Sequence, residues 1–372
     1  MRELTIAVLP GDGIGREVMA PCVALLESAA ARVGGFRLRF DTYEAGAGVY
    51  LQTGVALPEA VIRAAGEADA ILLGAMGLPD VRYANGTEIT PQIELRERFQ
   101  LYAGVRPVKL LRGAPTPLAD PRAQTIDCVI VRESTEGLFA ARTLSRRDGD
   151  AAVFDTMQIS RAACERLFDF AFELARKRKR PDRPARVTSI DKANVLPAMA
   201  FFRSVFVERA ARYPDVTADC LYVDAAAMRL VRAPWEFDVL VTENMFGDIL
   251  SDLGAALIGG MGMAPSADIG ERHAVFQPCH GTAPDIAGRG IANPTAMLLS
   301  GAMMLEWLAD RHRIPACAQA AAGVVAAIER AFADGSLVPV EHGGRADTQA
   351  IAARVQAELS ASAPTGRSST PA

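Results

Sequence analysis

Short apolar segments alternate with helical patterns along the chain. The runs that predict buried strands are residues 4–9, 70–73, 128–131, 187–190 and 237–241. Apolar residues at helical spacing follow at 17–31, 201–210 and 296–308. Because strands that alternate with helices are typical of sheets covered by crossover helices, the pattern predicts an α/β fold with a largely parallel core.

Composition and charge narrow the class of protein. The 372 residues are 50% hydrophobic and carry a net charge of −4, which gives nucleic acid no bulk attraction. No apolar run reaches the ~18 residues of a membrane helix, and the basic run 176–180 is expected to be the solvated last turn of a helix. The six cysteines form no C-x-x-C pair and a strand pattern starts at once, so we expect a reducing, cytoplasmic location. Cys279 next to His280 lacks an evident third group, which argues against a thiolate nucleophile.

Two aspartates in segment 243–252 suggest a metal site. Asp248 and Asp252 are four residues apart, so a helix would place both carboxylates on one face, one turn apart. Such a pair repels itself unless a cation lies between, and Mg²⁺ or Mn²⁺ prefers oxygen ligands. Ile249 and Leu250 between them predict a helix that is packed against the protein. A solvated acidic helix edge is the alternative.

Two glycine-rich segments are candidates for binding a phosphate-bearing cofactor. Residues 11–15 follow the first strand, but their spacing departs from the G-x-G-x-x-G of a Rossmann fold. Residues 280–288 precede a helix, and their backbone amides could hold phosphate. Asp285 could accept hydrogen bonds from ribose hydroxyls and would repel a 2′-phosphate, which favours NAD over NADP. A tight turn and an ordinary loop are the alternatives.

Several charged side chains lie at or near the ends of predicted strands. Arg96, Arg106 and Arg132 have the guanidinium forks that bind carboxylates through paired hydrogen bonds. Lys192 and Asp224 each follow a further apolar segment. Because ligands of α/β proteins bind beyond the carboxyl ends of strands, these residues could form one site, although each alone is more typical of a surface.

Together, these segments resemble the β-decarboxylating dehydrogenase family, which includes 3-isopropylmalate, isocitrate, homoisocitrate and tartrate or malate dehydrogenases. The matching segments, in family order, are residues 9–15, 73–75, 101–107, 131–137, 191–196, 222–224, 242–252 and 280–295. The resemblance implies an α/β, isopropylmalate-dehydrogenase-like two-domain fold with a central cleft, which is not a Rossmann fold. The implied boundaries are 1–105 plus 259–360 for the NAD-binding domain, 106–258 for the second domain, and 361–372 for a disordered tail.

The resemblance also implies an activity and a set of roles. The reaction would be the NAD-dependent, metal-dependent oxidative decarboxylation of a 3-substituted malate, a 2-hydroxy acid, with 3-isopropylmalate as the leading candidate. The implied substrate-binding residues are Arg96, Arg106, Arg132, Thr90 and Gln92. The implied catalytic residues are Lys192 and Asp224, and the implied ligands of Mg²⁺ or Mn²⁺ are Asp224, Asp248 and Asp252. The implied cofactor-binding residues are Ile14, Asn194, His280, Gly281, Thr282, Ala283, Asp285 and Asn293. The family is usually a homodimer with shared active sites, so an arm at 139–158 would clasp the partner subunit, which would receive Lys192 and Asp224.

The chain departs from the family pattern at a few positions. Phe139 stands where the family has a tyrosine that is associated with protonation of the enolate, so a lowered turnover is expected. Thr90 and Gln92 are polar where isopropylmalate enzymes tend to have leucines, which keeps isocitrate, homoisocitrate, and tartrate or D-malate open as substrates. Arg16 and Gln277 replace a proline and a glutamate, and neither is expected to touch the chemistry. A non-catalytic regulatory subunit, or a protein that only binds NAD or a dicarboxylate, remains as an alternative.

Overall fold

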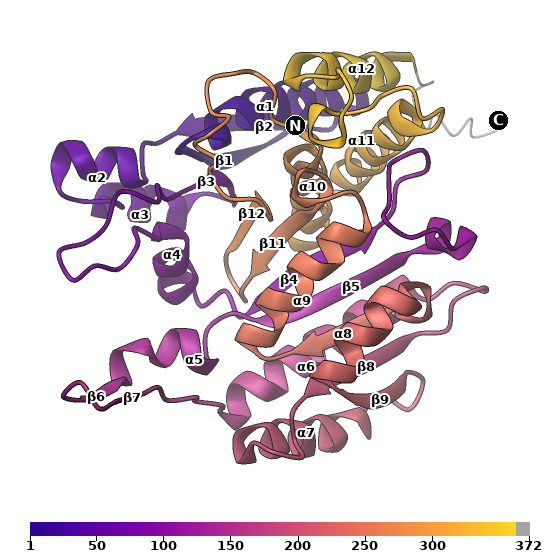
Figure 1. Ribbon diagram of the computed structural model, residues 1–372. Coiled ribbons are helices and arrows are strands. Elements are labelled where there is room, and N and C mark those ends of the chain that lie inside the picture. The colour runs from indigo at the N-terminus through magenta and orange to yellow at the C-terminus, as the bar shows by residue number, and fades with distance from the viewer. Residues whose placement is uncertain (362–372) are drawn as a thin grey trace.

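The computed structural model describes residues 1–361, apart from the side chains of residues 142 and 143. A single mixed sheet runs through the molecule (Figure 1). In spatial order its strands are β2 (Phe36–Thr42), β1 (Arg2–Gly11), β3 (Ala70–Ala75), β12 (Ala274–Pro278), β11 (Pro265–Ile269), β4 (Ala103–Lys109), β5 (Asp127–Glu133), β10 (Val239–Thr242), β8 (Arg186–Asp191) and β9 (Thr217–Tyr222).

The two outer parts of this sheet are parallel and its centre is antiparallel. β2, β1, β3 and β12 pair in parallel, as do β5, β10, β8 and β9. β12 with β11, β11 with β4, and β4 with β5 pair antiparallel. The largely parallel core expected from the sequence therefore holds on both sides, but not in the middle. The short connection from β11 to β12 leaves no room for the crossover helix that a parallel pair needs.

Helices cover the sheet and bring distant parts of the chain together. They are α1 (Ile14–Val33), α2 (Ala47–Thr53), α3 (Glu59–Glu67), α4 (Pro91–Phe99), α5 (Gly137–Ala140), α6 (Arg161–Arg178), α7 (Pro197–Ala210), α8 (Val223–Arg232), α9 (Asn244–Leu257), α10 (Thr295–His312), α11 (Pro315–Phe332) and α12 (Thr348–Ala361). Helix α1 packs against α10, α11 and α12, so both ends of the chain cover one part of the sheet (Figure 1). Ala361, the first residue of the expected tail, is the last residue of α12, and residues 362–372 lie outside the described part.

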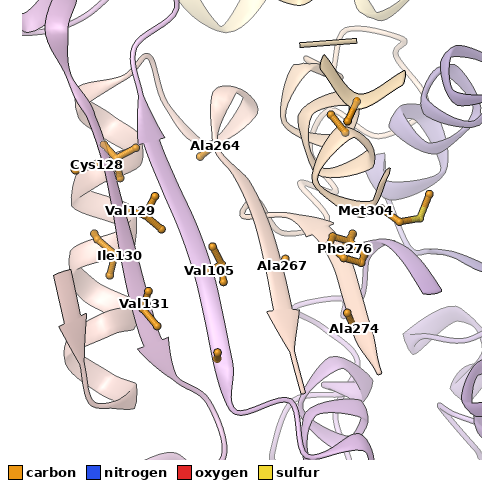
Figure 2. Close-up of a cluster of buried hydrophobic side chains, with 14 of the residues drawn as sticks. Val105, Cys128, Val129, Ile130, Val131, Ala264, Ala267, Ala274, Phe276 and Met304 are labelled. Carbon is orange, nitrogen blue, oxygen red and sulfur yellow. The ribbon is translucent and has the colours of Figure 1, made fainter. Parts of the chain in front are cut away.

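Small and branched apolar side chains form the core at the centre of the sheet. In Figure 2, residues 128–131 of β5 lie beside Val105 of β4, and Ala267 of β11 lies beside Phe276 of β12. These side chains are all buried. Burial of apolar area on both faces stabilises this region and fixes the strands from which the site is built.

A hairpin stands apart from the large sheet. β6 (Arg146–Asp148) and β7 (Ala152–Phe154) pair antiparallel and lie at the lower left edge of the molecule in Figure 1. Leu144, Val153 and Phe154 are exposed in this segment. An isolated two-stranded hairpin is marginally stable in water, and these apolar side chains are uncovered in a single chain.

The basic run at the end of α6 is not a solvated turn throughout. Arg178 is 16% exposed, and its guanidinium forms ion pairs with Asp127 and Asp238, at 3.0 and 2.9 Å. The expectation from the sequence is wrong for this residue, because the last turn of α6 ends over the half-buried carboxylate of Asp127 and the buried one of Asp238. No helix within residues 1–361 is long and apolar enough to cross a membrane.

Candidate active site

A polar cavity of about 280 Å³ opens where the antiparallel centre meets α4 and α9. Side chains that sequence analysis placed in one site line it together: Gln92, Arg96, Arg106, Arg132, Asp248 and Asp252. Phe139 and His280 also line it. The sheet register explains the meeting of the strands, since Arg132 of β5 pairs with Gly104 of β4, and Gly104 pairs with Asp268 of β11.

Asp268 holds two of the three arginines. Its Oδ1 accepts a hydrogen bond from Arg106 Nη2 at 2.9 Å, and its Oδ2 accepts one from Arg96 Nε at 3.0 Å. Burial acts to raise the pKa of Asp268, but Arg106 and Arg96 outweigh it and lower the pKa to about 2. The carboxylate is therefore ionised, and it fixes two cationic side chains in the wall of the cavity.

Arg132 is held from α9. Its Nε and Nη2 donate to Asn244 Oδ1 at 2.9 and 2.7 Å, and its Nη1 donates to Asp248. A Cβ on Gly247 would lie 2.6 Å from Arg132 Cβ, so glycine is what allows α9 to approach β5 this closely. Burial, and then Arg96, lower the pKa of Arg132 to about 10. A bound anion would relieve this crowding of positive charge.

Asp248 and Asp252 offer oxygen donors that fit a hard divalent cation. Both are on α9, and burial together with the neighbouring Asp248 raises the pKa of Asp252. Among the described residues, however, no three His, Cys, Asp or Glu side chains lie close enough to hold a metal ion. One chain thus supplies two of the three carboxylates expected for the site, and Asp224 of the same chain lies elsewhere.

The two glycine-rich segments, which are the candidates for binding a cofactor, lie against each other. Ile14 N–H donates to Thr282 O at 2.9 Å, and a Cβ on Gly13 would lie 2.1 Å from that oxygen. Gly281 lines the cavity, and the buried Nε2 of His280 has no hydrogen-bond partner within the described residues. An unpartnered buried nitrogen beside a cavity is suited to a ligand.

The other residues expected to bind the cofactor differ in exposure and in the hydrogen bonds that they already make. Asp285 is exposed, and Ala283 has a positive φ of 38° in the same loop. Asn293 is buried, donates to Glu341 Oε1 at 2.7 Å, and accepts hydrogen bonds from the backbone and side chain of Thr295. Its amide is thus engaged at the start of α10, so a contact with a cofactor would have to replace one of these bonds.

Of the three departures expected to affect turnover or substrate choice, Phe139 and Gln92 line the cavity and Thr90 does not. Phe139 lines the cavity, with the Arg132 guanidinium carbon 5.5 Å from its ring centroid. Gln92 also lines it, and its Oε1 is buried with no partner in the described part of the chain. Thr90 is not among the lining residues and instead borders a separate depression with Tyr83. Gln92, rather than Thr90, is placed to meet a ligand.

Lys192, Asn194 and Asp224 lie outside the cavity of their own chain. Lys192 Nζ donates to Asp224 Oδ1, and this hydrogen bond lowers the pKa of the exposed Asp224. Several apolar side chains are exposed near Lys192 and Asp224 in sequence or on α9. They are Val195, Tyr222, Met228, Val231 and Ile249. Ile249 is 60% exposed, so the sequence-based expectation of a packed turn holds for the buried Leu250 but is wrong for Ile249.

Sequence analysis missed Asp268, and it did not place Gln277 in the site. Gln277 lines the cavity, and its Nε2 donates to Asp268 Oδ2 at 2.9 Å. The position was expected not to touch the chemistry, and β12 places it in the cavity wall, beside the carboxylate that holds two arginines. Arg16, the other departure, forms an exposed pair with Glu44. A signal for Asp268 exists, since it is the one charged residue between 253 and 270.

The thiol in the cavity wall is not poised to attack. Burial raises the pKa of Cys279 to about 11, and its Sγ donates to Pro265 O at 3.5 Å. A thiol that stays protonated near neutral pH is a poor nucleophile. This agrees with the sequence-based argument against a cysteine mechanism.

Comparison with known proteins places the chain among dehydrogenases. A family model described as isocitrate/isopropylmalate dehydrogenase matches residues 5–352. The 3-isopropylmalate/3-methylmalate dehydrogenase of Methanocaldococcus jannaschii is 41% identical over 358 residues, which cover 95% of this chain and 99% of the relative. The 3-isopropylmalate dehydrogenase of Methanothermobacter thermautotrophicus is 41% identical over 360 residues, with 96% and 99% covered.

Solved structures agree with these relatives. Isocitrate dehydrogenase from Methylococcus capsulatus matches with a TM-score of 0.83 at 34% identity, covering 96% of this chain and 99% of that one. A β-decarboxylating dehydrogenase from Thermococcus kodakarensis matches with a TM-score of 0.76 at 34% identity, covering 96% of each chain. The protein is thus an enzyme of the β-decarboxylating dehydrogenase class. It belongs to the isocitrate/isopropylmalate dehydrogenase family, which confirms the resemblance and the fold class expected from its motifs.

Proposed function

We propose that this enzyme catalyses the NAD-dependent, divalent-metal-dependent oxidative decarboxylation of a 3-substituted malate, with 3-isopropylmalate as the first candidate. The observation that carries the proposal is the cavity in which Arg96, Arg106 and Arg132 face Asp248 and Asp252. Guanidiniums bind carboxylates, and paired aspartates bind a hard cation, so the cavity suits an acid that is both anionic and chelating. The relatives named for 3-isopropylmalate support this candidate.

The chain's own residues define what the site does. Arg96, Arg106 and Arg132 would bind and orient the carboxylates of the acid, which brings the C2 hydroxyl toward the metal side of the cavity. Asp248 and Asp252 would hold Mg²⁺ or Mn²⁺ together with Asp224 of a second copy. When bound, such a cation lowers the pKa of a coordinated hydroxyl and stabilises negative charge on the oxygen. Lys192 of the second copy would accept the hydroxyl proton as hydride leaves C2 for NAD⁺.

Loss of the β-carboxylate as CO₂ leaves an enolate that must be protonated. Phe139 lies where the donor is expected, and its ring has no proton to give. Water in the cavity, or another protonated group, would have to take this role. We therefore propose that protonation is slow in this enzyme.

The proposal includes a homodimer with shared sites and the division into domains at 1–105 plus 259–360 and 106–258. Two features support a second copy. Lys192 and Asp224 are not among the residues that line their own cavity, and exposed apolar side chains lie on β9, α8 and α9. The β6–β7 hairpin also exposes apolar side chains. Surfaces of this kind are typical of permanent homodimer interfaces.

Formation of NADH is the direct test. Purified protein with Mg²⁺ or Mn²⁺ is given 3-isopropylmalate, isocitrate, homoisocitrate, D-malate or tartrate, with NAD⁺ and separately with NADP⁺. We expect NADH from at least one acid, with CO₂ released in equal amount and NAD⁺ preferred. Turnover without CO₂, or none under any condition, contradicts the proposal, and the second result favours the regulatory or binding alternative.

A polar substituent at C3 is the second candidate that a specific observation favours. Gln92 presents an unpartnered carbonyl oxygen to the cavity, where a purely apolar substituent would leave it unsatisfied. A preference for tartrate, isocitrate or homoisocitrate in the same panel would support this reading, because each of these acids carries a polar group at C3. A preference for 3-isopropylmalate would instead require Gln92 to turn away from the ligand.

A further inference from the structure

Asp268 is a buried carboxylate that the proposed reaction does not use. It lies on β11 behind the cavity, with a side chain only 1% exposed. Its oxygens accept hydrogen bonds from Arg106, Arg96 and Gln277, at 2.9, 3.0 and 2.9 Å. A fully satisfied buried acid that touches two substrate-facing arginines has a direct influence on the charge that the cavity presents.

We propose that Asp268 sets the charge class of the substrate, so that the site selects 2-hydroxy acids with two carboxylates over those with three. This inference rests on the proposed function and narrows its substrate. It favours 3-isopropylmalate, D-malate and tartrate over isocitrate and homoisocitrate.

The charges around the cavity carry this inference. Three guanidiniums line it, together with the carboxylates of Asp248 and Asp252. Asp268 adds a third carboxylate, so these groups cancel. The Lys192–Asp224 pair, brought by a second copy, has no net charge either. A divalent cation then leaves two positive charges, which match a dianion, whereas a trianion would bring one uncompensated negative charge into a buried site.

Asp268 also decides which donors remain for the substrate. It engages Nε of Arg96, which leaves the terminal nitrogens of Arg96 as donors toward the cavity. Arg106 is more fully committed, since its Nη1 donates to Ala267 O at 2.9 Å and its Nη2 donates to Asp268. Arg106 therefore keeps fewer free donors than Arg96, which leaves little capacity in the wall for an extra carboxylate.

Gln277 keeps this charge count intact. Its Nε2 lies 2.9 Å from Asp268 Oδ2, and the residue is only 8% exposed. The glutamate that the family pattern places here would put a second carboxylate against Asp268 and reduce the positive charge of the cavity further. A neutral amide at 277 is therefore the natural companion of an acid at 268.

Binding experiments with matched variants test the inference. Asp268→Asn removes the charge with little change in shape, and Gln277→Glu adds one. The double variant Asp268→Asn/Gln277→Glu moves the charge to the neighbouring strand. Asp238→Asn is the control, because Asp238 is also buried and paired with an arginine, at 2.9 Å, but far from the cavity. Calorimetry uses Mg²⁺ without NAD⁺, so that no turnover occurs, with 3-isopropylmalate and isocitrate as probes.

We expect the unmodified enzyme to bind 3-isopropylmalate more tightly than isocitrate. In Asp268→Asn the ratio of the two dissociation constants should shift toward isocitrate by about tenfold or more. Gln277→Glu should shift it the opposite way, which gives a test even if Asp268→Asn does not fold. The double variant should return to the original ratio, and the Asp238 control should not change it.

The outcomes separate this inference from the proposed function. Tighter binding of isocitrate by the unmodified enzyme, or an unchanged ratio in both single variants, overturns the role of Asp268 even when NADH is formed. Selection of the dianion without any NADH or NADPH formed keeps the role of Asp268 and overturns the proposed activity.

Discussion

The cavity wall around Arg132 and the surface around Lys192 differ in how complete they are within one chain. The wall is buried and internally paired, and Asp268 and Asn244 hold its arginines in place. Lys192 and Asp224 pair with each other, with Lys192 also above the ring of the exposed Tyr222, on a partly apolar surface outside the cavity. A single chain can therefore orient an acid, but on the proposed function it cannot complete the metal site or remove the proton.

Mixed dimers of two inactive variants test most directly whether Lys192 completes the site of the other chain. Lys192→Ala and Asp248→Asn should each lower kcat about a thousandfold, because one removes the base and the other a metal ligand. When the two inactive variants are unfolded and refolded together in equal amounts, activity should return to about a quarter of the original. Half of the dimers are then mixed, and each mixed dimer has one intact site. Activity that does not return on mixing would mean that Lys192 serves its own chain.

The exposed apolar surface offers the next largest effect. Ile249, which is 60% exposed, belongs to this surface together with Met228 and Val231, which are 54% and 47% exposed. Ile249→Glu replaces its apolar side chain with a charged one. If this surface meets a second copy, the variant should be monomeric at micromolar concentration and lose about a hundredfold in activity. Leu51→Glu on α2 is the matched control, since Leu51 is 66% exposed and remote from this surface. Sedimentation measures the mass, and equal masses for both variants would contradict the interface.

Local sequence predicted those parts of the site that follow a strand or begin a helix. Arg132 and the Asp248–Asp252 pair could be placed because β5 and α9 have clear patterns of their own. Asp268 could not, since its partners Arg96 and Arg106 are 172 and 162 residues away in sequence. Such pairs depend on the order of the strands, and the antiparallel centre of the sheet has no local signal that fixes that order.

The same reason explains which features of the surface were missed. Ile249 follows a good helical pattern, but the pattern does not tell whether the neighbour is the same chain or another. Gln277 was treated as a departure from the family pattern that does not touch the chemistry. Only the pairing of β12 with β11 puts its amide beside Asp268. Distance along the chain, and not the chemistry of the residues, limited the prediction.

Substitution of Phe139 tests whether the cavity wall lacks the group that protonates the enolate. Phe139→Tyr should raise kcat about tenfold, because a phenol beside Arg132 could protonate the enolate. Phe139→Leu keeps the position apolar and should give no gain, which controls for a change in packing. Steady-state NADH formation with the preferred acid measures both. Equal or lower turnover for the tyrosine variant would show that protonation of the enolate does not limit the reaction.

The smallest expected effect is on the free energy of unfolding. It distinguishes the buried ion pairs of Asp268 from the exposed pair of Lys192 and Asp224. The pKa of Asp268 is lowered to about 2 from its usual 3.8, so its contribution to folding is complete above about pH 4 and declines as the pH falls toward 2. In urea unfolding, the stability difference between the unmodified enzyme and Asp268→Asn should shrink by about 1 kcal/mol between pH 6 and pH 3. In the Ile249→Glu background, which should keep the chain monomeric, Asp224→Asn should show no such change, because its carboxylate is exposed there and water screens its pair with Lys192. Equal pH dependence for the two variants would mean that the wall is no more preorganised than the open surface.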